Sequence, residues 1–427
     1  MSSKSKSLRG FVSSCEIIKP HAKPTLTPKL RFPEFRGAEG WKSEKVDELV
    51  DTVTPPKKLP TSIYAATGAF PIIDQSQSEI CGWTDDNDAL IQGGVPLIVF
   101  GDHTCVLKLI NRPFAQGADG IKILKSRPKI GISYLYQFLN YSPVVTEEYK
   151  RHYSILKEKP VIFPDFKTGE QQKIAACLTT LDEVIAAQSQ KLNALKTHKK
   201  GLMQQLFPRE GETQPRLRFP EFQAAPEWEV TTIGDLKPFV TSGSRGWAAF
   251  YADHGELFVR ITNLWRHSIY LDLSDSKFVQ LPLGANEGVR TQLKEHDVLI
   301  SITADIGIIG YVDGGVPSPA YINQHIALVR FDAAKLNGKY VAYFLASEKS
   351  QRQFRTSTDT GTKAGMSLIG IQKIEVMLPK LPEQHRIATC LTTLDDLITA
   401  QSAKLSALKT HKKGLMQQLF PSPGEEA

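Results

Sequence analysis

The chain has 427 residues, of which 41% are hydrophobic, and a formal net charge of +7. This length allows roughly two to four domains. The sequence lacks the run of roughly 18 apolar residues that a membrane helix needs, and its odd number of widely spaced cysteines fits a reducing compartment, so we expect a cytoplasmic protein with no membrane partner. The moderate excess of positive charge permits a nucleic-acid partner but does not require one.

The N-terminal end is predicted to be a mobile arm, residues 1–29, because it is rich in Ser, Lys and Pro. A leader with the sequence LRFPEF begins after it at Leu30 and recurs at Leu217. A tryptophan follows each copy, Trp41 and Trp228. The repeated leader indicates that an internal duplication organises the chain.

A body that we expect to be rich in β-strands follows each leader. Short β-branched runs between Gly, Asp and Asn turns are typical of mostly antiparallel strands with one or two helices. Leader and first body occupy residues 30–165; a linker, the second leader and the second body occupy residues 209–380. The bodies match only faintly, QGGVPLIVFGD with KEHDVLISITAD and PVIFP with IEVMLP.

A long helix is predicted after each body, at residues 166–208 and 381–421, with a tail at 422–427. Equivalent positions differ by 387 − 174 = 213 residues, and roughly 30 of about 38 positions are identical. Apolar residues recur in steps of four and three, the repeat of a coiled coil. The predicted seam, which also serves subunit docking, consists of Ile174, Leu178, Leu181, Ile185, Leu192, Leu195, Leu202 and Leu206 in one helix and Ile387, Leu391, Leu394, Ile398, Leu405, Leu408, Leu415 and Leu419 in the other. Two near-identical copies favour an intramolecular pair over a homodimer zipper.

Motifs for catalysis were sought and not found. The sequence has no GxxxxGK[ST] phosphate loop, no GxGxxG after a strand and no [DN]PP[YF] box for methyl transfer to an amine. Its 10 histidines show no metal-ligand spacing. We therefore predict no catalytic and no metal-binding residues.

Basic and polar residues gather in loops of both bodies, together with Gly, Ser and Thr. Hydroxyls, backbone N–H groups and cations are what phosphate contacts require, and Arg, Asn and Gln can also contact base edges. The candidate DNA contacts are Lys57, Lys58, His103, Lys122, Lys125, Arg127, Arg245, Arg260, Asn263, Arg266 and Lys363. For any single residue, an ordinary solvated loop is the competing interpretation.

The repeated block EQxxIAxCLTTLDxxIxAQxxKLxALKxHKKGLMQQLFP, with its leader, resembles the repeat of the specificity subunit of type I restriction-modification systems. The resemblance covers both leaders, both helices and the arrangement of two divergent bodies. It implies an α+β fold in which two β-rich target recognition domains are separated by two long antiparallel coiled-coil helices, pseudo-two-fold and pseudo-circular. The loop SGSRGW departs from the Gly-Thr-Pro loop that is more usual in that family.

The resemblance also implies a function. Each body would read one half of a bipartite, asymmetric site in double-stranded DNA, while the helix pair would set the spacer and dock two modification subunits. Those subunits would carry S-adenosylmethionine, and two restriction subunits would use ATP and Mg; this chain would bind no cofactor and would not be an enzyme. Two alternatives stay open: a non-DNA scaffold with two β-rich protein-binding modules on a helical hairpin, and an enzyme with an unrecognised site.

Overall fold

The structure is a computed structural model. It describes residues 26–91, 94–145, 151–282, 284, 286–356 and 365–421. The predicted tail, the candidate contact Lys363 and residues 1–25 of the predicted arm lie outside the described residues.

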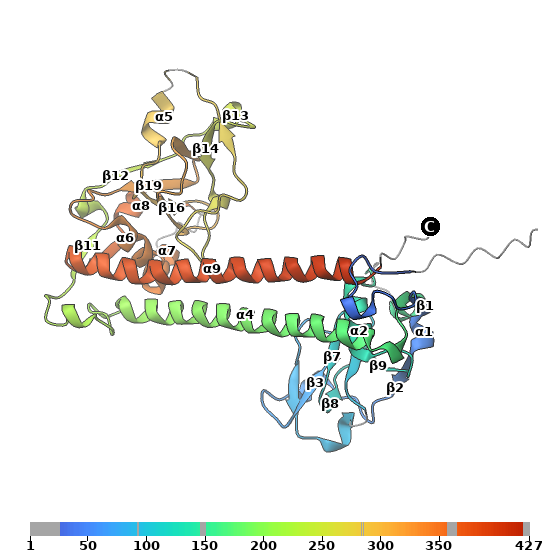
Figure 1. The fold of residues 1–427 in the computed structure, drawn as a ribbon. Coiled ribbons are helices and arrows are strands. Elements are labelled where there is room, and N and C mark those ends of the chain that lie inside the picture. Colours follow the sequence, from blue (N-terminus) through green and yellow to red (C-terminus); the bar gives the residue numbers. More distant parts are fainter. Residues whose placement is uncertain are drawn as a thin grey trace, which may run out of the picture. The chain divides into compact units, whose positions relative to one another are not determined.

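Two compact units make up the chain, and each is described by itself. Unit 1 contains the residues up to 187 and those from 405 onward, and unit 2 contains residues 188–404. The long helices α4 (Glu170–Leu206) and α9 (Leu381–Leu419) each contribute one part to each unit (Figure 1). Each unit therefore combines one predicted body with parts of both predicted helices. None of the described helices is long and apolar enough to cross a membrane.

Unit 1 contains two four-stranded sheets, in the orders β2-β9-β6-β7 and β4-β3-β8-β5, and a two-stranded sheet of β1 and β10. Its elements are β1 (Lys42–Lys45), α1 (Val46–Leu49), β2 (Val50–Val53), β3 (Phe70–Ile73), β4 (Gly82–Thr84), β5 (Leu90–Ile91), β6 (Leu97–Gly101), β7 (Leu107–Ile110), β8 (Phe114–Gln116), β9 (Ile121–Ser126), α2 (Ile132–Tyr141), α3 (Tyr153–Glu158) and β10 (Pro160–Phe163). All strand pairs are antiparallel except β3 with β8, which is parallel.

Unit 2 contains sheets in the orders β12-β19-β16-β17 and β13-β15-β14-β18, and a two-stranded sheet of β11 and β20. Its elements are β11 (Glu229–Thr232), β12 (Phe239–Ser242), β13 (Tyr251–Ala252), β14 (Glu256–Val259), β15 (Phe278–Val279), α5 (Asn286–Thr291), β16 (Val298–Ser301), β17 (Ile309–Tyr311), β18 (Ala320–Ile322), β19 (Ile326–Arg330), α6 (Gly338–Leu345), α7 (Glu348–Thr356), α8 (Leu368–Gln372) and β20 (Glu375–Leu378). Its one parallel pair is β14 with β18.

The antiparallel sheets of the two bodies have equivalent strand orders despite the divergent sequences. The mixed sheets share three equivalent strands and differ in the fourth, which pairs with β8 in unit 1 (β5) and with β15 in unit 2 (β13). In each, the third strand of the antiparallel sheet is the one that the faint sequence match identified, β6 in unit 1 and β16 in unit 2. The second match, PVIFP with IEVMLP, falls on β10 and β20, the strands before the long helices. The predicted α+β class with long helices and β-rich bodies is confirmed.

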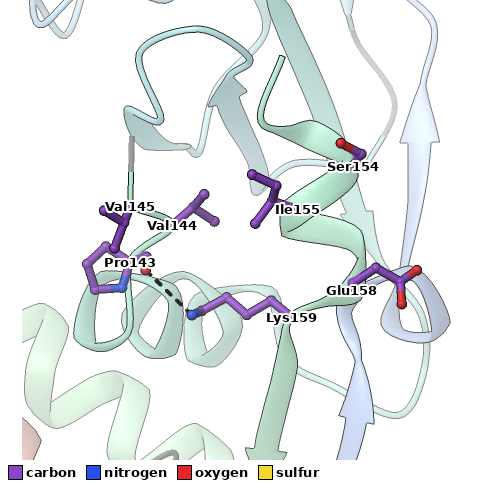
Figure 2. Close-up of a pocket in the computed structure, with 7 residues that line it drawn as sticks. All are labelled: Pro143, Val144, Val145, Ser154, Ile155, Glu158 and Lys159. Carbon is purple, nitrogen blue, oxygen red and sulfur yellow. Dashed lines mark hydrogen bonds between the residues drawn. The ribbon is translucent and has the colours of Figure 1, made fainter. Parts of the chain in front are cut away.

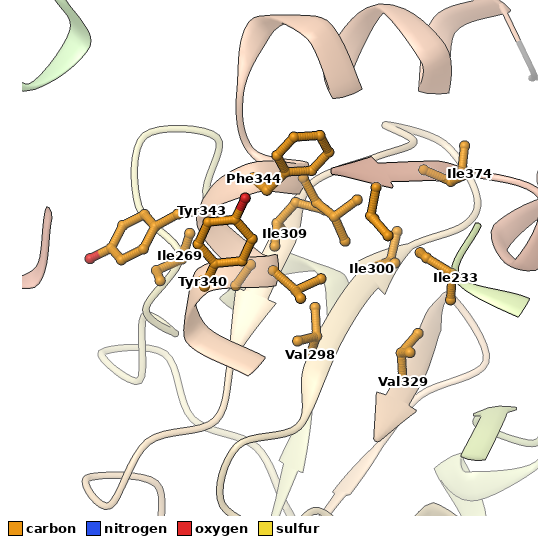
Figure 3. Close-up of a cluster of buried hydrophobic side chains, with 14 of the residues drawn as sticks. Ile233, Ile269, Val298, Ile300, Ile309, Val329, Tyr340, Tyr343, Phe344 and Ile374 are labelled. Atoms are coloured by element: carbon orange, nitrogen blue, oxygen red, sulfur yellow. The ribbon is translucent and has the colours of Figure 1, made fainter. Parts of the chain in front are cut away.

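The core of unit 2 shows why these short runs form strands. Val298 and Ile300 of β16 pack on one face of the sheet against helix α6, which presents Tyr340 and Phe344 to them (Figure 3). Leu299, between them, belongs to the cluster on the opposite face. This alternation follows from the two-residue period of a strand, and a sheet buried on both faces requires apolar residues at every position.

In each unit, an arginine of the leader pairs with a buried glutamate at the start of a long helix. The guanidinium of Arg31 donates to both carboxylate oxygens of Glu170, at 2.8 and 2.7 Å, and Arg218 does the same with Glu383 at 2.8 and 2.7 Å. Because Glu170 lies at the N-terminus of α4, its charge also interacts favourably with the helix dipole.

The leaders also contact the end of the other long helix. Leu217 N donates to Gln205 O near the end of α4, and Leu30 N donates to Gln418 O near the end of α9, each at 2.9 Å. Leu217 and Gln205 lie in consecutive segments of the chain. Leu30 and Gln418 make the equivalent contact although they are far apart in the sequence. This contact agrees with the pseudo-circular fold that the resemblance implies.

The long helices pair antiparallel within each unit, and their polar seam positions are occupied by ion pairs. Every predicted apolar seam residue is buried or half-buried. In unit 2, Lys199 Nζ lies 2.5 Å from Asp395 Oδ1; in unit 1, Lys412 Nζ lies 2.6 Å from Asp182 Oδ1. Gln188 Nε2 donates to Oε1 of its repeat equivalent Gln401 at 2.8 Å. The two copies of the repeat are therefore each other's partners.

Two buried tyrosines predict a loss of stability in alkali. Tyr134 donates its hydroxyl to Ile162 O at 2.7 Å, and Tyr340 donates to Met377 O at 2.6 Å. Burial raises the pKa of both hydroxyls well above the usual 10.0. Their contribution to stability is fully present below the unfolded pKa and is lost as the pH rises above it, by up to about 1.4 kcal/mol per pH unit for each tyrosine.

The alkaline effect is measured by urea unfolding between about pH 9 and pH 11. The variants Tyr134→Phe and Tyr340→Phe should show a shallower fall of stability with pH than the unmodified chain. An unchanged slope in both variants would contradict the assignment.

Candidate nucleic-acid interface

One edge of the antiparallel sheet in unit 1 collects most of the predicted DNA contacts of that body. Gly101, the last residue of β6, pairs with Ile121, the first residue of β9, and Val53 at the end of β2 pairs with Ile123. The loops after β2 and β6 therefore leave the sheet at the edge where β9 begins. We call this edge the unit 1 loop edge; it carries Lys57, Lys58, His103 and Lys122.

The lysines of the unit 1 loop edge are paired with surface acids. Lys57 lies 2.7 Å from Asp86, and Lys58 lies 2.6 Å from Asp119. Hydrogen bonding to Asp86 raises the pKa of Lys57. Both lysine side chains are 55% exposed, so these pairs are weak and a phosphate could replace either carboxylate.

Lys122 and His103, the other predicted contacts at this edge, interact with uncharged side chains. Lys122 Nζ lies over the ring of Tyr153, 5.3 Å from its centroid. The backbone N of His103 donates to Gln75 Oε1 at 3.4 Å.

Lys125 and Arg127 do not belong to the unit 1 loop edge. They lie at the other end of β9, where Lys125 pairs in register with Asp51 and Ser126 with Val50. Arg127 is 2.9 Å from Asp51. The structure thus separates Lys125 and Arg127 from the four residues that it brings together. The reason is that Lys122 lies at the start of β9, whereas Lys125 and Arg127 lie at or just after its end.

Unit 2 has the equivalent edge, which we call the unit 2 loop edge. Ser242 at the end of β12 pairs with Ala327, and Ser301 at the end of β16 pairs with Ile326. The loop after β12 carries Arg245, which is exposed. The backbone N of Asn323 donates to Val259 O, and this contact brings the end of β14 to the same edge.

Arg260 and Arg266, which follow β14, are both paired with aspartates of their own domain and so do not form an unpaired cationic patch. Arg260 lies 2.8 Å from Asp275. Arg266 Nε lies 3.0 Å from Asp305 Oδ2, and its Nη1 donates to Gln351 at 2.8 Å. Both arginines therefore also fix loops of their own domain.

Asn263 is not placed as the sequence predicted. Its side chain is 1% exposed. Its Oδ1 accepts from Arg260 N at 2.9 Å, and its Nδ2 donates to Asp272 O at 2.8 Å. A buried amide with these partners shapes the loop and cannot reach DNA from this position.

Three polar or aromatic residues of the unit 2 loop edge were missed from the sequence. His325 Nδ1 is 2.6 Å from Thr303 Oγ1, and Gln324 is half-exposed beside it. Trp265, next to Arg266, is 51% exposed. In the sequence, these residues are marked by their position just before β19 or after β14. That position indicates a place on the loop edge once the strand order is known.

A hollow of about 610 Å³ in unit 1 lies between α2 and α3, and its lining residues belong to neither loop edge (Figure 2). Its walls are largely apolar, with Val144, Val145 and Ile155 among the lining residues. Burial lowers the pKa of Lys159 at one side, and its ammonium donates to Pro143 O at 3.5 Å. Across the described ranges, no group of three or more His, Cys, Asp or Glu side chains is placed to hold a metal ion.

Residues 227–410, which span the body of unit 2 and most of α9, match the family model of the type I restriction modification DNA specificity domain. This part of the chain is therefore similar to that domain, in agreement with the resemblance of the repeated block.

Two proteins similar to this chain are named as specificity subunits. The type I restriction enzyme MjaVIII specificity subunit of Methanocaldococcus jannaschii is 24% identical over 259 residues, 59% of each chain. A second specificity subunit of the same organism is 24% identical over 262 residues, 59% of this chain and 56% of its own length. The chain thus spans just over half the length of these relatives.

The fold is also that of a solved specificity subunit. The S subunit of a type I restriction-modification system from M. genitalium superimposes with a TM-score of 0.62 at 17% identity, covering 93% of this chain and 100% of that one. At this identity, the likeness concerns the fold.

Proposed function

We propose that this chain is the DNA-specificity subunit of a type I restriction-modification complex and that it performs no chemistry itself. The observation that carries the proposal is the match of residues 227–410, which include the unit 2 loop edge, to the DNA specificity domain. Two bodies whose antiparallel sheets have equivalent strand orders, each with a basic and polar loop edge, support a bipartite site of which each body reads one half. S-adenosylmethionine, ATP and Mg would belong to the partner subunits.

The proposal is tested with the chain assembled with its modification subunits. We expect sequence-specific binding to duplex DNA whose affinity falls steeply as salt rises, because phosphate contacts release counterions. The resemblance implies that the modification subunits methylate adenine, so the methylated adenines in the host genome would give the two half-sites directly. Absence of duplex binding even at low salt would contradict the DNA function and favour the protein scaffold.

We propose that the long helices set the spacer between the half-sites. Helix α4 runs without interruption through parts of both units, so its length is a fixed quantity. Inserting one heptad after Ala187 and another after Lys404, where both helices pass from one unit to the other, keeps each existing ion pair within its unit. The inserts add about 10 Å of helix, or about three base pairs.

The expected result of the double insertion is a longer spacer with both half-sites unchanged, read from methylated adenines. A one-helix insertion is the control and should abolish binding, because it breaks the seam register. Altered half-site bases in the double insertion would contradict the spacer role.

We propose that the outward faces of the helices dock two modification subunits, one on each unit. Val184 in unit 1 and its repeat equivalent Leu397 in unit 2 are 45% and 44% exposed, unusual for apolar residues on a charged helix. Exposed His198 in unit 2 and His411 in unit 1 are also repeat equivalents. Equal faces fit two equal partners.

Val184→Glu and Leu397→Glu are each expected to remove one modification subunit, because each places a charge in one apolar contact. Native mass spectrometry of the complex measures the stoichiometry. The control Glu183→Lys changes charge beside the apolar position and should retain both partners. Retention of both subunits by the Val184/Leu397 double variant would contradict this docking face.

A further inference from the structure

The loop that follows β12 is forced into one path by two glycines. At Gly243, a Cβ atom would lie 2.3 Å from the carbonyl carbon of Asn323, closer than any side chain tolerates. Gly246 has a φ of +92°, which favours glycine. The two residues between them, Ser244 and Arg245, are therefore presented at a defined place on the unit 2 loop edge.

Both ends of this loop are also anchored by side chains. The guanidinium of Arg290 donates to Thr241 Oγ1, to Ser242 O at 2.8 Å and to Ser244 Oγ at 2.7 Å. After the loop, Trp247 is buried and stacks on Phe258 with ring centroids 5.0 Å apart. A loop that is ordered before binding loses little conformational entropy when a ligand arrives.

Arg245 differs from the other arginines of the unit 2 loop edge in what it touches. Arg260 and Arg266 are committed to acids of their own domain, and Arg290 holds the loop. Arg245 is exposed, and no hydrogen bond or ion pair joins it to another residue of the described ranges. Its side chain can therefore contact a ligand, and the backbone that carries it follows a fixed path.

We propose that Arg245 reads one base pair of the half-site of unit 2, by donating two hydrogen bonds to a guanine in the major groove. This inference rests on the proposed DNA function. A phosphate contact needs only a positive charge, and flexible lysines supply it at the unit 1 loop edge. A planar guanidinium can make two simultaneous hydrogen bonds to O6 and N7 of guanine, and the fixed path of the Gly243–Gly246 backbone brings it to a defined place.

Half-exposed Gln324 and His325 lie next in sequence to Asn323, whose backbone Gly243 touches. They extend the polar surface around Arg245 with further donors and acceptors for base edges. The reading surface of unit 2 is thus centred on the glycine-framed loop.

The test compares Arg245→Lys and Arg245→Ala in the complex with modification subunits, by competition binding to duplexes that carry each single base-pair change. Arg245→Lys keeps the charge but loses the planar fork. We expect it to lose about tenfold to a hundredfold of discrimination at one base pair of one half-site. Its salt dependence should match that of the unmodified complex.

Lys57→Ala in unit 1 is the control for a phosphate contact. It should weaken all sequences equally and reduce the slope of log affinity against log salt by about one. The inference is overturned if Arg245→Lys discriminates as the unmodified complex does, whether or not Arg245→Ala weakens binding uniformly. If the unmodified complex itself fails to discriminate between duplexes, the proposed function fails instead. Thermal unfolding of each variant confirms that its fold is intact.

Discussion

Replacing Arg31 with alanine is expected to destabilise unit 1 by about 3–5 kcal/mol, because it leaves a buried carboxylate without its partner. The Glu170 side chain is 1% exposed. Arg31 also donates to the backbone oxygens of Ala38 and Glu39, at 2.8 and 3.0 Å. The variant therefore loses both the helix start and the turn of the leader.

Hydrogen exchange measures this effect unit by unit, which a single global transition of a two-unit chain does not. The control is Lys173→Ala, whose pair with Glu34, at 3.3 Å, is half-exposed and worth at most about 1 kcal/mol. Arg218→Ala should produce the same loss in unit 2 and spare unit 1. Equal, small effects of Arg31→Ala and Lys173→Ala would show that the leader arginine does not anchor the helix.

The second large effect is expected from Asp395→Ala in the seam of unit 2. The carboxylate accepts from Lys199 Nζ at 2.5 Å and from the Tyr343 hydroxyl at 2.6 Å. The Lys199 ammonium also lies over the Tyr343 ring, 5.3 Å from its centroid. Removing the carboxylate leaves a buried cation without its counter-charge, at a cost of about 3–5 kcal/mol. The Tyr343 hydroxyl keeps a long contact with Thr392 Oγ1, at 3.5 Å.

The repeat supplies a matched control for this variant. Asp182, the equivalent of Asp395, pairs with Lys412, but its side chain is 39% exposed whereas that of Asp395 is 10% exposed. Asp182→Ala should therefore cost less, about 1–2 kcal/mol. Adding Lys199→Met to Asp395→Leu should recover much of the loss, because an apolar pair removes the uncompensated charge. Equal losses for Asp395→Ala and Asp182→Ala would contradict the role of burial.

The long helices were predictable because their signal is continuous. A 3.5-residue repeat in both copies predicted the apolar seam, and Lys199 and Lys412 occupy positions of the same repeat. The partners of these lysines were not predicted, because they are far away in the sequence. Asp395, the partner of Lys199, and Asp182, the partner of Lys412, both lie on the other long helix. The sequence pattern of one helix carries no information about which charge faces it.

The loop edges were only partly predictable. Lys57 and His103 were chosen for their composition, and strand order brings them to one edge. Arg127 was chosen on the same grounds and lies at the opposite end of its strand. Asn263 fits the composition of a base reader, but its amide is consumed by backbone groups of its own loop. Composition identifies residue types, and only the sheet register decides where they meet.

The contact of Leu30 with Gln418 has a consequence for the order in which the protein folds as it is synthesised. Unit 2 is one uninterrupted stretch, residues 188–404, and is complete once that stretch has left the ribosome. The core of unit 1 needs Phe420, whose ring lies 5.6 Å from Tyr134 and 5.4 Å from Phe138.

The first body to be translated is therefore the last to be completed. Until Phe420 emerges, the apolar surface around Tyr134 and Phe138 stays uncovered, and such surfaces in nascent chains favour aggregation and chaperone binding. The duplication that gives both bodies the same helical support thus delays completion of the first body until the second long helix has been made.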